Sequence, residues 1–464
     1  MTKKLFSFPL SSPTLFAALF ALNIAAGLFV MMVLPHLFPA GHLGMGLFIG
    51  DSTSIHEGAV RVLEAWRTRG LSASLLLEYP ALYDWLVASV YFLFSTHPLS
   101  FLPIQAGSMA LAGTLFYRML LKIGFTGLAS TVGAVWLALN PQTFEWSTQL
   151  LRDGIFLVAI LIYLTAYFSK ERWRSALLGL TGCLLVITTR PHWIRVLLAA
   201  GLLLALFQLF QNVFRRAQPA AWIPKSNVMI PLIFPAFIYL CFREMPESYG
   251  RIFASYEVVN REARVAPTRL HSSSGILPSW REFHPPWLNN TFFEIYNLRL
   301  ERIKIGGRSI IDEHRFLNSP KAQIGYLPRA LQIGLFAPFP QEIWQAASDG
   351  RVNPELEKIR AWPQEGLGRT TTRLAREFMP WLTLICSLSM LGVTLALADA
   401  QKRPGMIWLT LFCVPQLMLL AMVSPNLGTL VRLRYPFYAP LVCLGLAAWL
   451  DWLGSRNHRL RSPS

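Results

Sequence analysis

The segment Gly50–Ala59 carries an aspartate shortly after a long apolar stretch. A charged side chain near the end of a membrane helix is costly unless it has a partner or a function, so Asp51 is the first candidate for chemistry. A carboxylate there can act as a general base, with His56 and Glu57 as neighbouring polar groups for a substrate. The structural alternative is that Asp51 or Ser52 caps the following helix, with His56 and Glu57 solvated.

A second polar segment, Asn140–Gly154, also ends beside an uncharged apolar stretch. It contains Arg152 and Asp153, and Asp153 directly precedes the apolar residues. Asp153 is therefore a second candidate carboxylate, and its structural alternative is an N-cap or an internal pair with Arg152. Two carboxylates from separate loops are a thin basis for a divalent cation such as Mg²⁺ or Mn²⁺, so the metal content stays open.

A third polar segment, Ser424–Pro436, carries Arg432 and Arg434, followed by Tyr435. A guanidinium group matches phosphate oxygens with two parallel hydrogen bonds, so both arginines are candidates for holding a phosphate. Arg190, which precedes Pro191 in a predicted outer kink between two apolar stretches, is a third candidate. The structural alternative is that these arginines pair with one of the carboxylates named above.

The composition indicates that membrane helices position these residues. Of the 464 residues, 53% are hydrophobic and only 14% are charged, whereas an average soluble domain has about 25% charged residues. This composition excludes a disordered protein, a disulfide-rich secreted domain and an ordinary soluble enzyme. It predicts an all-α polytopic membrane protein.

Apolar stretches of about 20 residues are long enough to cross a hydrocarbon core of about 30 Å as helices. Thr14–Leu34 supplies the first span, which we interpret as an uncleaved anchor because further spans follow. The other apolar stretches lie near residues 81–95, 101–117, 126–139, 154–169, 175–189, 193–210, 228–242, 331–344, 379–398, 405–423 and 435–453.

Basic residues between the spans predict the orientation, because cytoplasmic loops carry an excess of Lys and Arg. Six clusters are expected in the cytoplasm: Lys3/Lys4, Arg118/Lys122, Lys170/Arg172/Arg174, Arg215/Arg216/Lys225, Lys402/Arg403 and Arg456/Arg459/Arg461. They account for most of the net charge of +17, so no nucleic acid is needed to explain it. The number of crossings must place all six clusters on the cytoplasmic side. This requires a short or interfacial segment at 81–95 and a re-entrant segment at 331–344, which leaves about 10–11 transmembrane helices.

This topology divides the chain into three parts. Residues 1–242 form an N-terminal transmembrane core with a first outer loop at 35–80, residues 243–378 form an extracytoplasmic loop subdomain, and residues 379–464 form the C-terminal transmembrane helices. Within the first outer loop, apolar residues at helical spacing predict an amphipathic helix over 59–67.

The order of these segments resembles the GT-C superfamily of membrane glycosyltransferases, which includes protein mannosyltransferases, aminoarabinose transferases of lipid A and oligosaccharyltransferases. The matching features are Asp51 after the first span, Glu78–Tyr83, which is similar to the family's Pro-Pro-Leu-Tyr element, and Pro141 and Ser147 ahead of Asp153. The resemblance covers roughly residues 1–210 and the C-terminus locally.

Two further segments, Leu335–Pro340 and Gly428–Pro436, look like those of superfamily members from exopolysaccharide loci. The chain departs from the family in two respects. It lacks the paired acidic motif, since Ser52 follows Asp51, and it lacks the tryptophan-rich acceptor motif of oligosaccharyltransferases.

The resemblance implies an inverting transfer of a sugar from a polyprenyl-phosphate-linked donor to a glycan, lipid or protein acceptor. The reaction would take place on the non-cytoplasmic face of the bacterial inner membrane, with the site towards the periplasm or exterior. The roles that this chemistry requires are a base (Asp51), a second catalytic carboxylate (Asp153) and cations for the donor phosphate (Arg432, Arg434 and Arg190). Neighbouring candidates for substrate binding are His56, Glu57, Glu78, Arg152 and Tyr435.

Two alternatives stay open. A polysaccharide polymerase or ligase acting on lipid-pyrophosphate-linked glycans would use similar outer arginines. A transporter would show an internal repeat and charged residues deep within broken helices. The sequence shows no repeat, and its acidic residues cluster at the outer ends of the spans.

Overall fold

The computed structural model describes residues 11–37, 44–47, 50–71, 82–169, 171–191, 193–214, 229–243, 286–305, 310–312, 315, 317–337, 385, 387–399 and 402–461. The regular elements in these ranges are helices, which agrees with the predicted all-α class. Pairing of the β type is limited, within the same ranges, to one isolated bridge between Ile310 and Asn426.

Contacts within the chain group it into two compact units. Unit 1 comprises Met1–Ala263, Leu391–Leu411 and Cys443–Ser464, and unit 2 comprises Arg264–Met390 and Phe412–Val442. This grouping differs from the predicted division by polarity, because two C-terminal segments pack with the N-terminal helices.

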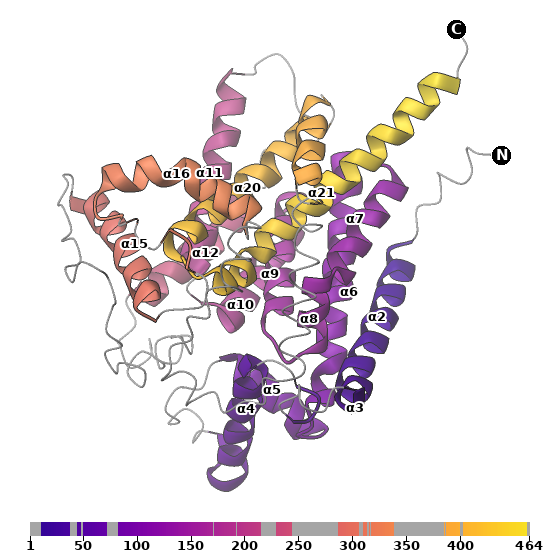
Figure 1. Ribbon diagram of the computed structural model, residues 1–464, viewed down its shortest axis with the longest axis vertical. Coiled ribbons are helices and arrows are strands. Elements are labelled where there is room, and N and C mark those ends of the chain that lie inside the picture. Colours follow the sequence, from indigo (N-terminus) through magenta and orange to yellow (C-terminus); the bar gives the residue numbers. More distant parts are fainter. Residues whose placement is uncertain are drawn as a thin grey trace. The chain divides into compact units, whose positions relative to one another are not determined.

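Unit 1 is built from helices, most of which run alongside one another (Figure 1). The helices up to residue 123 are α2 (Ser12–Leu28), the π-helical turn η1 (Phe29–Val33), α3 (Leu34–Leu37), α4 (Gly50–Arg69), α5 (Leu82–Leu93), the 3₁₀ turn η4 (Pro98–Phe101) and α6 (Leu102–Ile123). They are followed by α7 (Gly127–Leu139), α8 (Pro141–Thr148), α9 (Asp153–Tyr167), α10 (Arg172–Thr189), α11 (Trp193–Phe214) and α12 (Met229–Arg243). Nearly every residue of α9 is buried, so this helix lies at the centre of the unit.

Residues at the helix ends explain the hairpin of α6 and α7. Gly124 ends α6 in the left-handed conformation with φ of 104°, which glycine adopts without a Cβ clash. Thr126 caps α7, because its hydroxyl accepts a hydrogen bond from the backbone N–H of Ala129 at 3.5 Å. The chain therefore reverses direction within a few residues.

Four helical stretches in the described residues are long and apolar enough to cross a membrane. They are Ser12–Leu37, Pro98–Ile123, Arg403–Val423 and Thr429–Ser455. One side of α10 also exposes large apolar residues at helical spacing: Trp173, Leu177, Leu180 and Leu184. Such a stripe is suited to contact with lipid, and these features indicate a membrane protein. The count of about 10–11 crossings stays a prediction.

Charged residues gather at one end of unit 1. The Nζ of Lys402 lies 2.6 Å from the Asp399 carboxylate and 2.8 Å from that of Asp451. Asp451 also accepts a hydrogen bond from the backbone N–H of Thr126, in the turn between α6 and α7. Burial would lower the pKa of Lys402, but its hydrogen bonds to the two carboxylates outweigh burial and raise it.

The basic residues of α6 lie at this same end. Arg118 donates to the hydroxyl of Ser12 at the start of α2, over 2.9 Å. Lys122 donates to the carbonyl of Phe168, just after α9, over 3.0 Å. Two of the clusters predicted to be cytoplasmic, at 118/122 and 402/403, therefore share one end of the unit.

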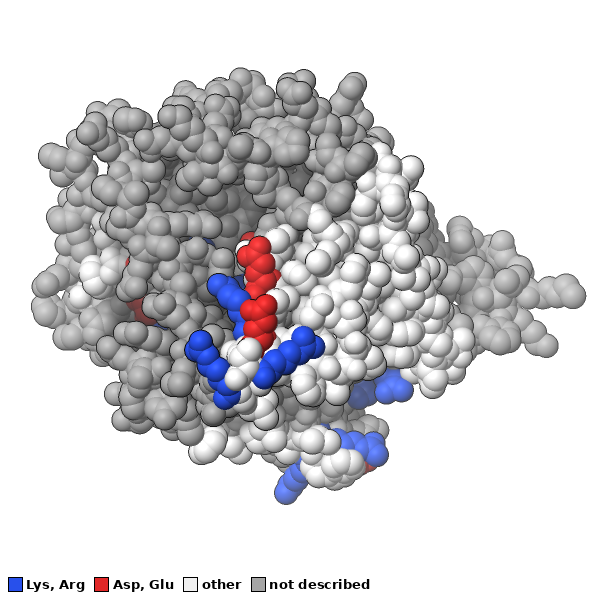
Figure 2. All heavy atoms as spheres, turned by 90° about the horizontal axis from the view of Figure 1, so that it is seen from below, with Lys and Arg blue, Asp and Glu red and all other residues white. Residues whose placement is uncertain are grey.

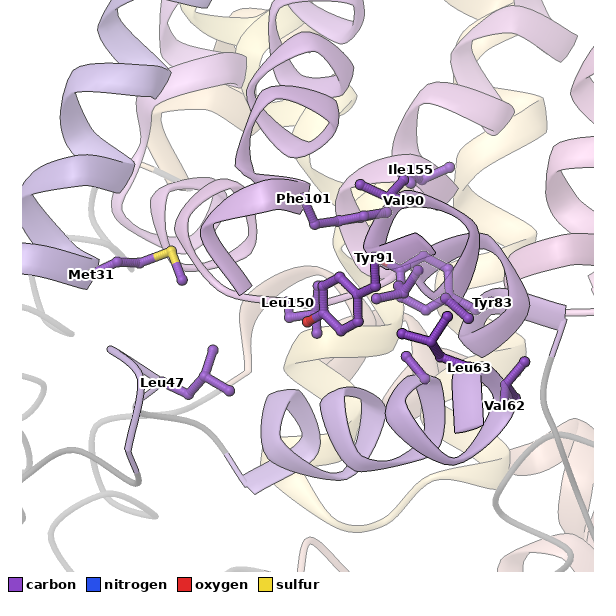
Figure 3. Close-up of a cluster of buried hydrophobic side chains, with 13 residues drawn as sticks. Met31, Leu47, Val62, Leu63, Tyr83, Val90, Tyr91, Phe101, Leu150 and Ile155 are labelled. Carbon is purple, nitrogen blue, oxygen red and sulfur yellow. The ribbon is translucent and has the colours of Figure 1, made fainter. Parts of the chain in front are cut away.

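The opposite end of unit 1 carries α4 and α5, joined by a hydrophobic cluster (Figure 3). From α4 the cluster takes Ala59, Val62 and Leu63, which confirms the predicted amphipathic helix. Tyr83 and Tyr91 of α5 belong to the same cluster. α5 has 12 residues, a length of about 18 Å, which is too short for a hydrocarbon core of about 30 Å. This length favours the expected short or interfacial segment.

Unit 2 contains α15 (Pro286–Ile305), α16 (Pro320–Phe336) and parts of α20 (Arg403–Val423) and α21 (Leu427–Arg461). α16 approaches α20 closely at Gly334, where a Cβ would crowd the backbone of Leu417. The predicted re-entrant segment 331–344 begins as the last turns of α16, and its residues 338–344 lie outside the described ranges.

Candidate functional site

An ion pair joins the start of α9 to the end of α10. Asp153 is the first residue of α9, and Arg190 directly follows α10. The Arg190 guanidinium donates to the Asp153 carboxylate over 2.5 Å, and both side chains are only 1% exposed. Each charge needs the other, because a buried charge without its partner is strongly destabilising. The structure therefore pairs Asp153 with Arg190, which was predicted to hold a phosphate.

Aromatic rings fix the position of the Arg190 guanidinium. It lies over the ring of Phe156, 5.6 Å from the centroid, and the Phe156 and Trp193 ring centroids are 5.5 Å apart. The positive charge gains from the electron-rich ring face as well as from the carboxylate. The Nε of Arg190 has no hydrogen-bond partner among the described residues, so the guanidinium retains a donor that the ion pair does not use.

Gln105 of α6 clamps the turn that precedes α9. Its Nε2 donates to the carbonyl oxygens of Leu151 at 2.6 Å and Gln149 at 3.3 Å. The hydroxyl of Tyr83 donates to the same Leu151 carbonyl over 2.9 Å. Gln105 is not among the predicted residues. The pattern that points to it is a lone amide within the apolar stretch 101–117.

The chain just ahead of the first polar segment lies against the second segment. The Nε2 of Gln149 donates to the carbonyl of Gly46 over 3.3 Å, and Leu47 and Leu150 belong to one hydrophobic cluster (Figure 3). Gly46 has φ of 77°, and a Cβ there would clash with the carbonyl of Met31. Only glycine suits this conformation and this close approach. The structure thereby brings the chain ahead of α4 next to the chain ahead of α9.

Asp51 lies in the first turn of α4 with its side chain exposed. A negative charge is stabilised near the positive end of the helix dipole. Since α4 already includes Gly50, both Asp51 and Ser52 lie inside the first turn rather than ahead of it. Ser52 is fully buried, and its hydroxyl has no hydrogen-bond partner among the described residues. Of the two, Asp51 is the residue that a substrate can reach from solvent.

The exposed face of α4 carries charges of both signs. Figure 2 views the molecule from the side on which α4 lies in Figure 1, and acidic and basic side chains stand close together there. The exposed charged residues of α4 are Asp51, Glu57, Arg61, Glu64, Arg67 and Arg69. Glu57 and Arg61 are four residues apart, the spacing at which opposite charges attract on a helix. This charged face of α4 is therefore expected to be in contact with water.

His56 belongs to the contact between α4 and α5. Its Nδ1 lies 2.9 Å from the hydroxyl of Tyr91, and the two rings meet edge to face with centroids 5.6 Å apart. Partial burial lowers the pKa of His56, the charge of Glu57 opposes this shift, and His97 adds to it. Neutral His56 is therefore favoured, beside the exposed carboxylate of Glu57.

In unit 2, Arg434 caps the end of α16. Its guanidinium donates to the carbonyls of Ile333 and Gly334 at 3.0 Å each, and to that of Ala337. It also lies over the ring of Tyr438, 4.5 Å from the centroid. The last carbonyls of a helix lack partners within the helix and carry partial negative charge, so a cation is stabilising there. This placement favours a structural role for Arg434.

A second buried arginine of unit 2, Arg299 of α15, donates hydrogen bonds to the carbonyls at the end of α20. It donates to the carbonyls of Met422 and Asp312, each at 3.1 Å. The Asp312 carboxylate accepts hydrogen bonds from Arg329 and Tyr326. Burial would raise the pKa of Asp312, but these hydrogen bonds outweigh it and lower the pKa. None of these residues is among the predicted ones.

The remaining predicted residues are spread over both units. Arg432 is partly exposed and Tyr435 is buried, both in the part of α21 that belongs to unit 2. Arg152 is partly exposed just ahead of α9. Glu78 lies outside the described residues. The predicted meeting of the two aspartates with the arginines of α21 stays a prediction, since these residues belong to different units.

The described residues contain no group of three or more His, Cys, Asp or Glu side chains suited to a metal ion. No protein-family model and no curated protein matches the chain.

Proposed function

We propose that the chain is an inverting membrane glycosyltransferase that uses a polyprenyl-phosphate-linked sugar donor. The observation that supports this most is the arrangement of the two polar segments at one end of unit 1. The hydrogen bond from Gln149 to Gly46 and the shared cluster in Figure 3 bring the chain ahead of α4 next to the chain ahead of α9 there. The clusters at 118/122 and 402/403 lie at the opposite end.

The exposed carboxylate of Asp51 is the proposed base. An acceptor hydroxyl must lose its proton as it attacks the anomeric carbon, and a carboxylate within hydrogen-bond reach takes it up. Attack from the face opposite the leaving phosphate inverts the anomeric configuration. The neighbouring groups His56 and Glu57 are proposed to contact the acceptor.

The leaving phosphate gains negative charge as the glycosidic bond breaks, so fixed cations there favour the transition state most. Arg432, which is partly exposed, is the proposed phosphate ligand. The Asp153–Arg190 pair is proposed to hold the start of α9 against the end of α10. The Nε of Arg190, which the ion pair does not use, is proposed as a further hydrogen-bond donor to the phosphate. We leave Arg434 out of this set because it caps α16.

The proposed location is the bacterial inner membrane, with the site facing the periplasm or exterior. The proposed acceptor is a glycan, lipid or protein. A divalent cation is not required by these roles.

The test is sugar transfer by the purified protein in liposomes, with a panel of polyprenyl-phosphate sugars as donors. Asp51→Asn keeps the size of the side chain and removes the base, so transfer should fall by about 100-fold or more. The matched control is Glu64→Gln, an exposed carboxylate of the same helix, which should retain activity. Full activity of Asp51→Asn would overturn the assignment of the base, and no transfer from any donor by the wild-type protein would overturn the function.

A further inference from the structure

Three consecutive apolar residues, the last two of α5 and Phe94 directly after it, are left exposed by the described part of the chain. Phe92, Leu93 and Phe94 are 61%, 71% and 77% exposed. Earlier residues of the same helix, such as Val87 and Tyr91, are buried against α4. Single exposed apolar residues are ordinary, but three bulky ones in a row at one helix end need a partner that removes them from water.

The position of this end along the chain identifies that partner. The membrane-crossing stretch Pro98–Ile123 begins four residues after Phe94. The turn between them is compact, because the hydroxyl of Ser100 donates to the carbonyls of Ser95 at 2.6 Å and His97 at 2.7 Å. Four residues of chain reach at most about 14 Å. When α6 crosses the bilayer, Phe94 is therefore held close to its boundary.

We propose that the end of α5 together with the next residue, Phe92–Phe94, inserts into the lipid at the membrane boundary and anchors the α4–α5 hairpin there. The 12 residues of α5 are too few to cross, so the helix lies at the boundary. Its apolar end enters the acyl-chain region while the charged face of α4 stays in water, as in helices that lie in the membrane surface. The occupant of this surface is lipid, and the inference does not depend on the proposed transferase activity.

Spin labels test this directly in the full-length protein reconstituted into phosphatidylcholine vesicles. The five native cysteines are replaced by alanine, and single cysteines are placed at Leu93, at Phe94 or, as a control, at Arg67 on the exposed face of α4. Collision rates of each label are measured with oxygen, which concentrates in lipid, and with a water-soluble nickel chelate. Labelled variants are compared only when their melting temperatures match that of the cysteine-free parent.

Labels at Leu93 and Phe94 should collide several-fold more with oxygen than with the chelate, and the label at Arg67 should show the reverse. Equal access of the chelate to all three positions would overturn the proposal, because the end of α5 would then lie in water. Exclusion of both reagents from Leu93 and Phe94 would overturn it as well, because protein would then cover this end. Spin–spin coupling between labels on two copies of the chain would also overturn the proposal, because a second copy and not lipid would then cover this end.

Discussion

At the scale of single residues, the Asp153–Arg190 pair joins two side chains that are 37 positions apart along the chain. Asp153→Asn leaves a buried guanidinium without its counter-charge. We expect this change to destabilise the protein by about 3 to 5 kcal/mol, the usual result of breaking a buried ion pair. Unfolding of the protein in detergent, followed by circular dichroism, measures the loss.

A surface ion pair of the same unit provides the control for this variant. Arg174 and Glu171 are separated by 2.9 Å, but their side chains are 58% and 47% exposed. Glu171→Gln should therefore change the stability by less than about 1 kcal/mol. Similar losses for Asp153→Asn and Glu171→Gln would contradict the importance of burial.

Gly46 provides a second prediction at this scale. Gly46→Ala imposes a left-handed conformation on alanine and drives its Cβ into the carbonyl of Met31. Gly44→Ala is the matched control, because Gly44 has φ of 103° but nothing within 4 Å of the added Cβ. Both variants carry the backbone strain, about 1–2 kcal/mol, and only Gly46→Ala carries the clash. Melting temperatures should therefore fall much further for Gly46→Ala, and equal shifts would contradict the close contact.

The sequence alone singles out Asp153 and Arg190 but does not predict that they meet. Each is unusual because of its charge beside an apolar stretch, which is a local property. Their pairing depends on how α9 and α10 pack as a hairpin, and many partners satisfy the same local pattern. Gln105 is harder still, because an amide without charge is tolerated in apolar stretches for many reasons.

At the scale of elements, Arg434 is predicted to hold the end of α16. Arg434→Met keeps the apolar stem but leaves the carbonyls of Ile333 and Gly334 without their donors. We expect a loss of about 2 to 3 kcal/mol and faster hydrogen exchange in the last turn of α16. Hydrogen exchange read by mass spectrometry measures both the local and the global effect.

Arg432→Met is the comparison for this variant. Arg432 lies half a turn away on α21, is partly exposed and is the proposed phosphate ligand. This variant should leave hydrogen exchange in α16 unchanged while it weakens use of the donor. Normal exchange in α16 for Arg434→Met, together with weaker use of the donor, would show that Arg434 binds phosphate instead.

Elements with a strong period were predicted best. The amphipathic helix over 59–67 follows from side chains at helical spacing, and α4 buries that face. The arginines of 424–436 were harder, because their predicted position on the outer side of the membrane contradicts the charge rule without giving the reason. For Arg434 the reason is the end of a helix about 100 residues away, which no local pattern encodes.

At the scale of the whole molecule, the two ends of unit 1 are predicted to lie on opposite sides of the membrane. Single cysteines at Arg67 of α4 and Arg174 of α10, both exposed, should react with a membrane-impermeant maleimide from opposite sides of sealed vesicles. The charge rule places position 174 in the cytoplasm. Labelling of both positions from one side would contradict this topology.

Composition was sufficient to predict a helical membrane protein, because the cost of burying charge in lipid acts on the whole sequence. It was not sufficient to predict how many helices cross. α5 and α9 are both apolar, but the 12 residues of α5 pack beside α4, whereas the 15 residues of α9 lie at the centre of unit 1. Composition does not separate these two kinds of short helix, because burial depends on the neighbouring helices.

The π-helical turn η1 sets which faces of the two halves of the helical stretch Ser12–Leu37 are buried. A wider turn accommodates one more residue than an α-helical turn does. Ahead of it, Leu15, Leu19 and Gly27 face the interior, and just within it Met31 lies against Gly46. A regular α-helical turn with one residue fewer in place of Phe29–Val33 would keep the two halves nearly aligned, because the wide turn takes up that residue. A residue removed from α2 itself would instead rotate the side chains ahead of the deletion by about 100° about the helix axis. Either Leu15 and Leu19 or Met31 would then face the wrong way.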